Sequence, residues 1–442
     1  MDLIKPDDPR YDEARVVFNA MIDRRPAVIA RCTSAADVVD ALALADREGY
    51  EVAVRAGGHS VAGMSVNNDG IVIDVRSMNT VAVDPDARQV RVGAGATWGE
   101  FDRATQEHGL ATTGGRVSTT GVAGLTLGGG SGWLERRFGL TCDSLISVDL
   151  VTADGRQVTA SADENPDLFW ALHGGGGNFG VATSFVFRLH PVGPLVTAGL
   201  MAWPGDAAPD LARLYRDTAY DAPDEFGSGL VFLTGPPEPF IPLHLQGRTI
   251  VAIAALWSGD TAEGTEVLAP FRQMAPEVDL VGEMPYASFQ CMIDDPPGLH
   301  NYWSGDYHDS FPDEALDVFV KYGSERQSPF TQQILVPWGG AIARVPDDAT
   351  PLTKRTVSWI SHPFAMWENA ADSAKNIEWA RSFRRDIARF ASGGVYLNFI
   401  GDEGEDRVRA AFGDEKYGRL AAIKGEWDPN NVFRGNQNIK PA

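Results

Sequence analysis

The sequence is poor in cysteine, in basic residues and in long apolar runs. Its three cysteines, Cys32, Cys142 and Cys291, are an odd and widely scattered set, which favours neither a disulfide framework nor a zinc site. Lysine and arginine number 38 against 60 acidic residues, so the formal net charge is -22, and no basic cluster offsets it. This balance would repel a polyphosphate and disfavours binding to nucleic acid. No run of 18 apolar residues occurs, so we expect no membrane-spanning helix.

Several well-known motifs are also missing. No H-E-x-x-H or comparable spacing predicts a metal site, and no G-x-x-x-x-G-K-[ST] predicts a P-loop. Residues 175–180 match G-x-G-x-x-G, but a helix is expected before them and a strand after them. A dinucleotide-binding fingerprint instead follows a strand and opens a helix, so a Rossmann fold is not predicted. Residues 1–9 lack an apolar core and do not resemble a signal peptide, which makes a cytoplasmic location the expectation.

The pattern of apolar residues and turns predicts an α+β protein of two domains. With 442 residues, of which 44% are hydrophobic, the chain is long enough to build two cores. A first domain is expected over about 1–195, because capping residues, periodicity and Gly/Pro breaks alternate there. Its expected elements are helices at 35–48, 97–108 and 165–172, hairpins at 81–92 and 145–159, and strands at 71–75 and 181–189. In the second domain we expect strands at 249–257 and 331–336 and a helix at 372–390.

The most informative segment is the turn Gly57-Gly58-His59, which ends a β-rich run. Two glycines let the backbone turn sharply and approach a ligand closely, and the histidine then stands at the mouth of the turn. Taken alone, such a turn is more often a polar cap than a binding site. Three further glycine clusters, at 93–95, 114–132 and 174–180, fall within the first 180 residues and favour a ligand site.

The loop 114–132 is the longest of these clusters and predicts an anion site. Backbone N–H groups in a glycine-rich concavity can bind a phosphate without a positive side chain, and the hydroxyls of Ser118, Thr119 and Thr120 can add to them. Such an arrangement suits an acidic protein that holds a pyrophosphate.

In combination, these segments resemble a known family. The resemblance rests on residues 55–60, 114–132, 138–145, 148–155, 165–172 and 177–180, and on the C-terminal stretches 396–399, 417–420, 427–433 and 436–439. The chain resembles the vanillyl-alcohol-oxidase-type FAD flavoproteins and, more narrowly, the berberine bridge enzyme-like oxidoreductases. The resemblance implies a two-part PCMH-type FAD-binding domain, 1–195 completed by 397–442. It also implies a substrate domain, 196–396, in which helices cover an antiparallel sheet.

The resemblance further implies FAD bound covalently through His59. In this family the histidine of the Gly-Gly-His turn bonds to the 8α-methyl carbon of FAD, and many relatives add a second tether from a cysteine. Val117 stands at that second place here, so a single link is expected, as in members of the 6-hydroxynicotine-oxidase type. The other cofactor-binding residues that the resemblance implies are Arg55, Ala56, Gly57, Gly58, Ser60, Gly114, Gly115, Val117, Ser118, Thr119, Thr120, Gly121, Gly124, Gly128, Gly129, Gly130, Val181, Asn398, Asn436 and Gln437.

The catalytic base is left open by the resemblance. These enzymes transfer a hydride from a C–H bond to the flavin while a base takes a proton from an O–H or N–H group. Several relatives use a tyrosine one position after the asparagine of a Tyr-x-Asn motif, where this chain has Phe399. Tyr396 and Asn398 remain candidates, although strand alternation would put Tyr396 and Phe399 on opposite faces. A His, Tyr, Asp or Glu of the substrate domain is an alternative, and His300 and His308 lie either in the pocket or on an exposed loop.

The leading functional hypothesis is therefore an FAD-dependent oxidoreductase that acts on an alcohol, a sugar, an amine or a natural product. Dioxygen is the expected electron acceptor, and the aromatic residues of the second domain favour a flat or bulky donor. The alternatives are a flavin dehydrogenase with another acceptor, a flavin-binding protein without turnover, and a carboxylate hydrolase without a cofactor. No metal is expected, and the sequence predicts neither the substrate nor the oligomeric state.

Overall fold

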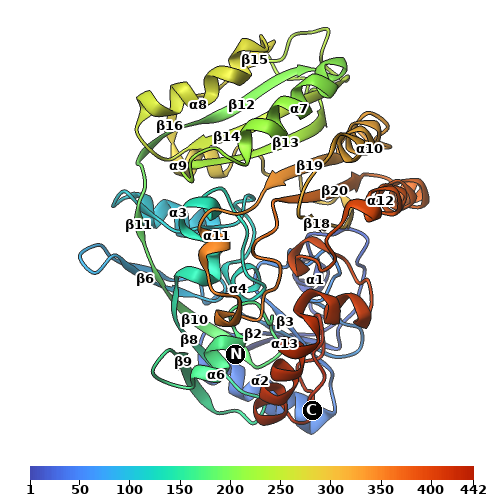
Figure 1. Cartoon of the computed structure of the whole chain (residues 1–442). Helices are drawn as coiled ribbons and strands as arrows, with labels where there is room; N and C mark the ends of the chain where they lie inside the picture. The colour runs from blue at the N-terminus through green and yellow to red at the C-terminus, as the bar shows by residue number, and fades with distance from the viewer.

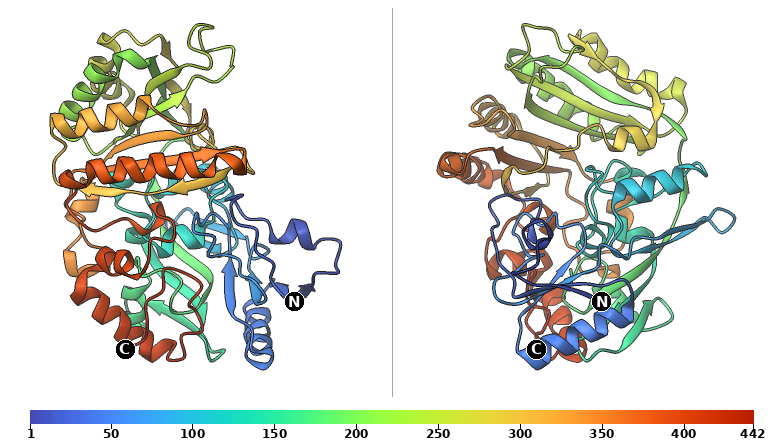
Figure 2. Two further views of the ribbon diagram at one scale, coloured as in Figure 1. Left: turned by 90° about the vertical axis from the view of Figure 1, so that its right-hand side faces the viewer. Right: turned by 180° about the vertical axis from the view of Figure 1, so that it is seen from behind.

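Two regions organise the chain in the computed structural model, which describes residues 1–442 (Figure 1). The lower region of Figure 1 contains both chain termini and three of the four sheets, the smallest of which pairs β7 with β11, and the upper region contains one large sheet with the helices that cover it. Figure 2 shows the same division from the side and from behind. Mixed helices and antiparallel sheets confirm the predicted α+β class.

The lower region begins with a four-stranded sheet in the order β1-β2-β4-β3. Strands β2, β4 and β3 are parallel, and β1 pairs antiparallel with β2. Helix α2 connects β2 to β3, begins after the capping side chain of Ser34 and ends at Gly49, which has a left-handed φ of 69°. The bounds are β1 (Asp2–Ile4), α1 (Tyr11–Arg15), β2 (Val28–Arg31), α2 (Ala35–Glu48), β3 (Val52–Arg55) and β4 (Ile71–Asp74).

A five-stranded antiparallel sheet in the order β5-β6-β10-β8-β9 completes the N-terminal part of this region. The predicted capping box is confirmed, since the Thr97 and Glu100 side chains each accept a hydrogen bond from the other residue's backbone N–H. The bounds are β5 (Val81–Asp84), β6 (Gln89–Gly93), α3 (Trp98–Gln106), β7 (Leu110–Ala111), α4 (Val122–Leu127), α5 (Glu135–Phe138), β8 (Leu145–Val151), β9 (Gln157–Ser161), α6 (Pro166–Ala171), β10 (Val181–Arg188) and β11 (His190–Pro191).

The upper region is built on nine antiparallel strands, and most of them follow the order β15-β12-β14-β13-β19-β20-β17. One face of this sheet packs against four helices, α7, α8, α10 and α12, and together they enclose a core of 30 buried residues. The strand bounds are β12 (Leu195–Pro204), β13 (Phe226–Thr234), β14 (Thr249–Trp257), β15 (Val278–Asp279), β16 (Gly282–Pro285), β17 (His300–Trp303), β18 (Asp306–His308), β19 (Gln332–Pro337) and β20 (Trp359–Trp367). The helix bounds are α7 (Ala208–Ala219), α8 (Thr261–Gln273), α9 (Tyr286–Gln290), α10 (Asp313–Ser324), α11 (Ala341–Arg344) and α12 (Ser373–Ile387).

The chain returns to the lower region after α12 and ends there with α13 (Glu405–Trp427). One cluster of 47 buried hydrophobic residues joins residues 28–189 with residues 395–439. Lys424 fastens this return, because its fully buried ammonium donates to the Asn178 carbonyl at 2.6 Å and to the Asp428 carboxylate at 2.6 Å. The C-terminal segment thus packs into the same core as the N-terminal sheets, while the exact domain boundaries remain a prediction.

Two local predictions are wrong. Residues 396–399 do not form a strand, because Leu397–Phe399 is a 3-10 turn that brings the Tyr396 and Phe399 rings to a centroid distance of 4.8 Å. His300 and His308 lie in the strands β17 and β18, so neither is on an exposed loop. No helix of the fold has both the length and the apolar character needed to cross a bilayer.

Candidate functional site

A cavity of about 680 Å³ lies between the two regions. Its walls come from the glycine loops of the lower region, from the helix-free face of the nine-stranded sheet and from residues 397–400, 433 and 435–437. Of the 62 residues that line it, 32 are hydrophobic, so the few polar side chains among them are the ones that can orient a ligand.

Two glycine loops cross at the floor of the cavity with their backbones in contact. A Cβ atom on Gly57 would meet the Gly121 nitrogen at 2.2 Å, and one on Gly121 would meet the Gly57 nitrogen at 2.4 Å. Because no side chain fits at either position, only glycine allows both loops to reach the cavity at this point. The turn predicted at 57–59 and the loop predicted at 114–132 are therefore built against each other.

The backbone N–H groups of the turn are free to bind a ligand. Gly57, Gly58, His59 and Ser60 donate no backbone hydrogen bond within the chain, although all four residues line the cavity. Gly58 has a left-handed φ of 74°, so the run of N–H groups curves. Successive N–H groups in such a curve form a concavity that suits an anion, and Arg55, the nearest cation, instead donates to the Ala14 and Val16 carbonyls.

His59 stands beside this turn with its ring held on two sides. The ring stacks on Phe18 at a centroid distance of 4.2 Å, and Nε2 lies 2.9 Å from the Thr119 hydroxyl. Burial lowers the pKa of His59 to about 4, so the imidazole is neutral at pH 7. Nδ1 has no partner in the chain.

Fourteen of the predicted cofactor-binding residues line the cavity, and seven do not. Those that line it are Ala56, Gly57, Gly58, His59, Ser60, Gly115, Val117, Thr120, Gly121, Gly124, Gly128, Asn398, Asn436 and Gln437. Those that do not line it are Arg55, Gly114, Ser118, Thr119, Gly129, Gly130 and Val181. The Thr119 hydroxyl lies next to His59 Nε2. The Gly130 N–H donates to the Tyr396 hydroxyl, and the Arg55 guanidinium donates to the Ala14 carbonyl.

Tyr396 does not line the cavity either, and it holds the loop 128–131 in place. Its hydroxyl accepts hydrogen bonds from the backbone N–H groups of Gly130 at 2.7 Å and Ser131 at 2.9 Å. It also accepts one from the Asn398 amide at 3.0 Å, so Tyr396 and Asn398 contact each other in space and not only in sequence. Burial raises the pKa of Tyr396 well above its usual range. These contacts make Tyr396 a positioning residue for the loop, and Asn398 is the member of the pair that faces the cavity.

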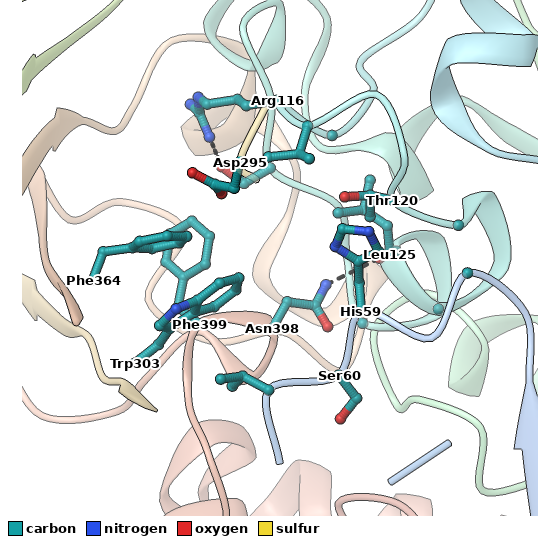
Figure 3. A pocket seen from close by; sticks show the side chains of 18 of the residues that line it. His59, Ser60, Arg116, Thr120, Leu125, Asp295, Trp303, Phe364, Asn398 and Phe399 are labelled. Carbon is teal, nitrogen blue, oxygen red and sulfur yellow. Dashed lines mark hydrogen bonds between the residues drawn. The ribbon is translucent and has the colours of Figure 1, made fainter. Parts of the chain in front are cut away.

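An aromatic wall forms the opposite side of the cavity. The rings of Trp303 and Phe364 (Figure 3) stack at a centroid distance of 4.0 Å. The rings of His362 and Phe399 stack at 4.3 Å. His362 and Phe364 lie two residues apart on β20, so they share the strand face that points to the cavity.

His362, on the aromatic wall, was not predicted from the sequence as a site residue. Nδ1 lies 2.6 Å from the Ser304 carbonyl, which can only accept, so Nδ1 carries the proton and Nε2 carries a lone pair. Nε2 is buried without a partner in the chain. Burial lowers the pKa of His362 to about 4, and the ring is neutral at pH 7.

The charged side chains of the cavity are Arg116, Asp294 and Asp295. Arg116 is engaged by the Glu135 carboxylate at 2.6 Å and the Ser131 hydroxyl at 2.8 Å. Asp294 accepts from the Ser118 backbone at 2.6 Å and also from the Ser118 hydroxyl. No group of three or more His, Cys, Asp or Glu residues is arranged to hold a metal ion.

Comparison with known proteins places this site in a family. Residues 26–161 match the model of an FAD binding domain, and residues 395–440 match the model described as berberine and berberine like. (R)-6-hydroxynicotine oxidase of Paenarthrobacter nicotinovorans is 31% identical over 457 residues, which cover 100% of this chain and 96% of that protein. The uncharacterised FAD-linked oxidoreductase YgaK of Bacillus subtilis is 29% identical, with 99% and 96% covered. The crystal structure of 6-hydroxy-D-nicotine oxidase from Arthrobacter nicotinovorans superimposes with a TM-score of 0.89 at 28% identity, with 100% of this chain and 98% of that chain covered.

The chain belongs to the berberine bridge enzyme-like family of FAD-linked oxidoreductases. The predicted family, the FAD cofactor and the enzyme class are thereby confirmed. Physcomitrella patens BBE-like 1, at 23% identity and a TM-score of 0.87, has the same fold over 100% of this chain.

The residues of this berberine bridge enzyme-like chain fit an FAD. Besides the free N–H groups, Gly124 and Gly177 line the cavity, and a Cβ atom on either would meet nothing within 4 Å. Glycine is not needed there to let two parts of the chain pack, so the open space is left for a ligand. Gly128 differs, because a Cβ atom there would meet the Asn398 Oδ1 at 2.1 Å, which keeps the Asn398 amide at the cavity edge.

Several lining residues were not among the predicted cofactor-binding residues, although some of them carried a readable signal in the sequence. Gly174, Gly175, Gly176 and Gly177 line the cavity, although the motif at 175–180 does not open a Rossmann helix. Rejecting the Rossmann fold did not exclude a binding role, and the glycine cluster itself was the signal. His362, Phe364 and Asp295 had no local signal, since their position depends on the register of distant strands and on a loop.

Proposed function

We propose that the protein is an FAD-dependent oxidase with one covalent bond between His59 and its flavin, and that it oxidises a small organic donor by hydride transfer. The observation that carries the proposal is the neutral, ring-clamped His59 beside a row of free backbone N–H groups. The name of the 31% identical relative, an oxidase, supports dioxygen as the acceptor. When bound, the flavin supplies the hydride acceptor.

The clamp on His59 favours Nδ1 as the bonding atom. Nε2 faces the Thr119 hydroxyl and the Phe18 ring fixes the imidazole plane, so Nδ1 is the nitrogen with a free position. Attachment at this nitrogen would replace one imidazole N–H and one C–H of the 8α-methyl group by a C–N bond. Dioxygen would accept the two electrons and two protons released and give hydrogen peroxide. Val117, at the cavity wall, has no sulfur and supports a single link.

We assign the proton-accepting role to His362. His362 lines the cavity, its buried Nε2 carries a lone pair without a partner in the chain, and the Nδ1 bond to the Ser304 carbonyl fixes both the tautomer and the ring plane. The O–H or N–H group of a donor placed against the aromatic wall can donate to Nε2 and pass its proton there as the hydride leaves carbon. Phe399, which replaces the tyrosine of relatives, stacks on the His362 ring and keeps water from it.

The covalent bond is tested by unfolding the purified protein in acid. Flavin colour that stays with the precipitated polypeptide is the expected result, and the variant His59→Ala should release all of it. Release of all flavin from the wild-type protein would overturn the covalent bond. Stopped-flow mixing of the reduced protein with air tests the acceptor: reoxidation within seconds supports an oxidase, and reoxidation over many minutes indicates a dehydrogenase.

A further inference from the structure

One charged side chain of the cavity has no partner in the chain. Arg116 and Asp294 are both occupied by other protein groups, whereas Asp295 makes no hydrogen bond or ion pair. Asp295 lies on the loop between α9 and β17, and Figure 3 shows its carboxylate pointing into the space that the rings of Trp303, Phe364 and Phe399 border. The loop is fastened to the flavin side through Asp294 and Ser118, which keeps Asp295 over the cavity.

A carboxylate in such a place is costly unless something pairs with it. Apart from Asp294, its neighbours on the loop that also line the cavity, Met292, Ile293 and Pro296, are apolar. Burial and the charge of Asp294 raise the pKa of Asp295 to about 7, which reflects the missing counter-charge. A cation in the cavity would supply that counter-charge and bring the pKa down.

We propose that Asp295 binds the ammonium group of the substrate, so that the donor is a cationic amine with a flat apolar body. This inference rests on the proposed function and names the substrate class of the same site. The ammonium pairs with the Asp295 carboxylate, and the apolar body lies along Trp303 and Phe364, whose ring faces attract a cation as well.

Other donor classes fit this part of the cavity less well. An anionic donor would be repelled by Asp294 and Asp295 together, since Arg116 is already paired with Glu135. A sugar needs several polar side chains around its hydroxyl groups, but the wall that faces Asp295 is aromatic. The overall charge of -22 also favours approach of a cation over that of an anion.

The test is isothermal titration of the flavin-loaded protein, under argon, with three indoles that differ only in the end group. Tryptamine ends in an ammonium, tryptophol in a hydroxyl and indole-3-acetate in a carboxylate. We expect tryptamine to bind about tenfold more tightly than the other two, which corresponds to one charge-assisted contact. Asp295→Asn should weaken tryptamine binding about tenfold and leave tryptophol binding unchanged. Asp309→Asn, which removes an exposed charge on the same region, is the matched control and should change neither.

The pH dependence of the wild-type protein gives a second measurement that needs no variant. Tryptamine should bind less tightly at pH 6 than at pH 8, because the Asp295 carboxyl, with a pKa of about 7, is mostly neutral at pH 6. The groups that face the same cavity are Asp294, Arg116, His59 and His362, and the two histidines, with pKa values of about 4, do not titrate between pH 6 and 8. In Asp295→Asn the difference between pH 6 and 8 should vanish.

Equal binding of tryptamine and tryptophol, absence of tryptamine binding, or full tryptamine binding by Asp295→Asn would each overturn the inference. Thermal unfolding midpoints of both variants check that they are folded. The flavin content of the same samples after acid precipitation reports on the proposed function separately. Covalent flavin without a preference for tryptamine would support the proposed function and overturn the substrate class. A preference for tryptamine without covalent flavin would support the substrate class and overturn the covalent bond.

Discussion

The two sides of the cavity are built from different materials. The flavin side is made of backbone: glycine turns whose N–H groups are free and whose Cβ positions are blocked or open to the cavity. The opposite side is made of side chains, namely the rings of β17 and β20 and the carboxylate of Asp295. A backbone surface can bind the same cofactor in many relatives, whereas a side-chain surface can change with each donor. The boundary between the two surfaces therefore separates the chemistry that the family shares from the choice of an individual substrate.

The largest effects are expected at Gly57 and Gly121, where the backbones of two glycine loops are in contact. Gly57→Ala or Gly121→Ala places a methyl group 2.2–2.4 Å from backbone nitrogen, which cannot move aside like a flexible side chain. We expect each variant to lose its flavin and to lower the free energy of unfolding by about 1–3 kcal/mol. Flavin absorbance and urea unfolding of the flavin-free proteins measure both effects.

Gly124→Ala is the matched control for these two variants. The same methyl group meets nothing within 4 Å there and points into the cavity, so the flavin-free protein should keep its stability or gain up to about 1 kcal/mol, since Gly124 lies in α4. Flavin content should nevertheless fall. Normal flavin content in Gly57→Ala would show that the two loops do not cross as described.

On the side-chain surface, the largest effect is expected from His362→Gln. Removing the lone pair of Nε2 should lower kcat by about 10²–10⁴-fold while the flavin remains attached to His59. A donor found by anaerobic flavin bleaching serves for the assay. Phe399→Tyr in the His362→Gln background should restore part of the activity, because it places a hydroxyl next to the lost imidazole. An unchanged kcat in His362→Gln would remove His362 as the proton acceptor.

The flavin side could be predicted from sequence because its requirements are local. A position that needs glycine reveals itself in the residue type, as at Gly57, Gly58 and Gly121, wherever the backbone later comes to lie. The substrate side could not be predicted in this way. His362 lies in β20, whose nine residues are all buried, so no alternation of polar and apolar residues marks the face that points to the cavity. That face depends on the pairing of Ile334 with His362 across β19 and β20, which is a non-local contact.

The Tyr396–Phe399 segment shows the same limit over a longer distance in sequence. A strand was expected there, and its alternation would have separated the two rings. The chain instead forms a tight turn because the Tyr396 hydroxyl is held by the Gly130 and Ser131 N–H groups, which lie more than 260 residues away in sequence. The strand propensity of residues 396–399 contains no information about partners so distant in sequence.

A smaller effect is expected from Tyr396→Phe. This variant tests whether Tyr396 only positions the loop 128–131 or accepts the proton of the donor. Loss of the hydroxyl leaves two buried backbone N–H groups without an acceptor, so the free energy of unfolding should fall by about 2 kcal/mol. Because the hydroxyl does not line the cavity, kcat should fall less than about tenfold. A loss of kcat as large as in His362→Gln, at unchanged stability, would make Tyr396 the base.

The smallest effect is expected from protonation of His362 and its influence on the free energy of unfolding. Burial holds the pKa of His362 at about 4, whereas an unfolded histidine has a pKa of about 6.5. Between these values the unfolded chain binds more protons, so the folded state loses stability as the pH falls from about 6.5 towards 4, by about 1 kcal/mol from this residue at pH 5.5. Urea unfolding at pH 7.5 and 5.5 should therefore show a shallower loss in His362→Gln than in the wild type, and His244→Gln, at a ring that is 65% exposed, serves as the control. An identical loss in His362→Gln and the wild type would mean that water reaches the His362 ring. The aromatic wall would then not be the dry surface that distinguishes it from the flavin side.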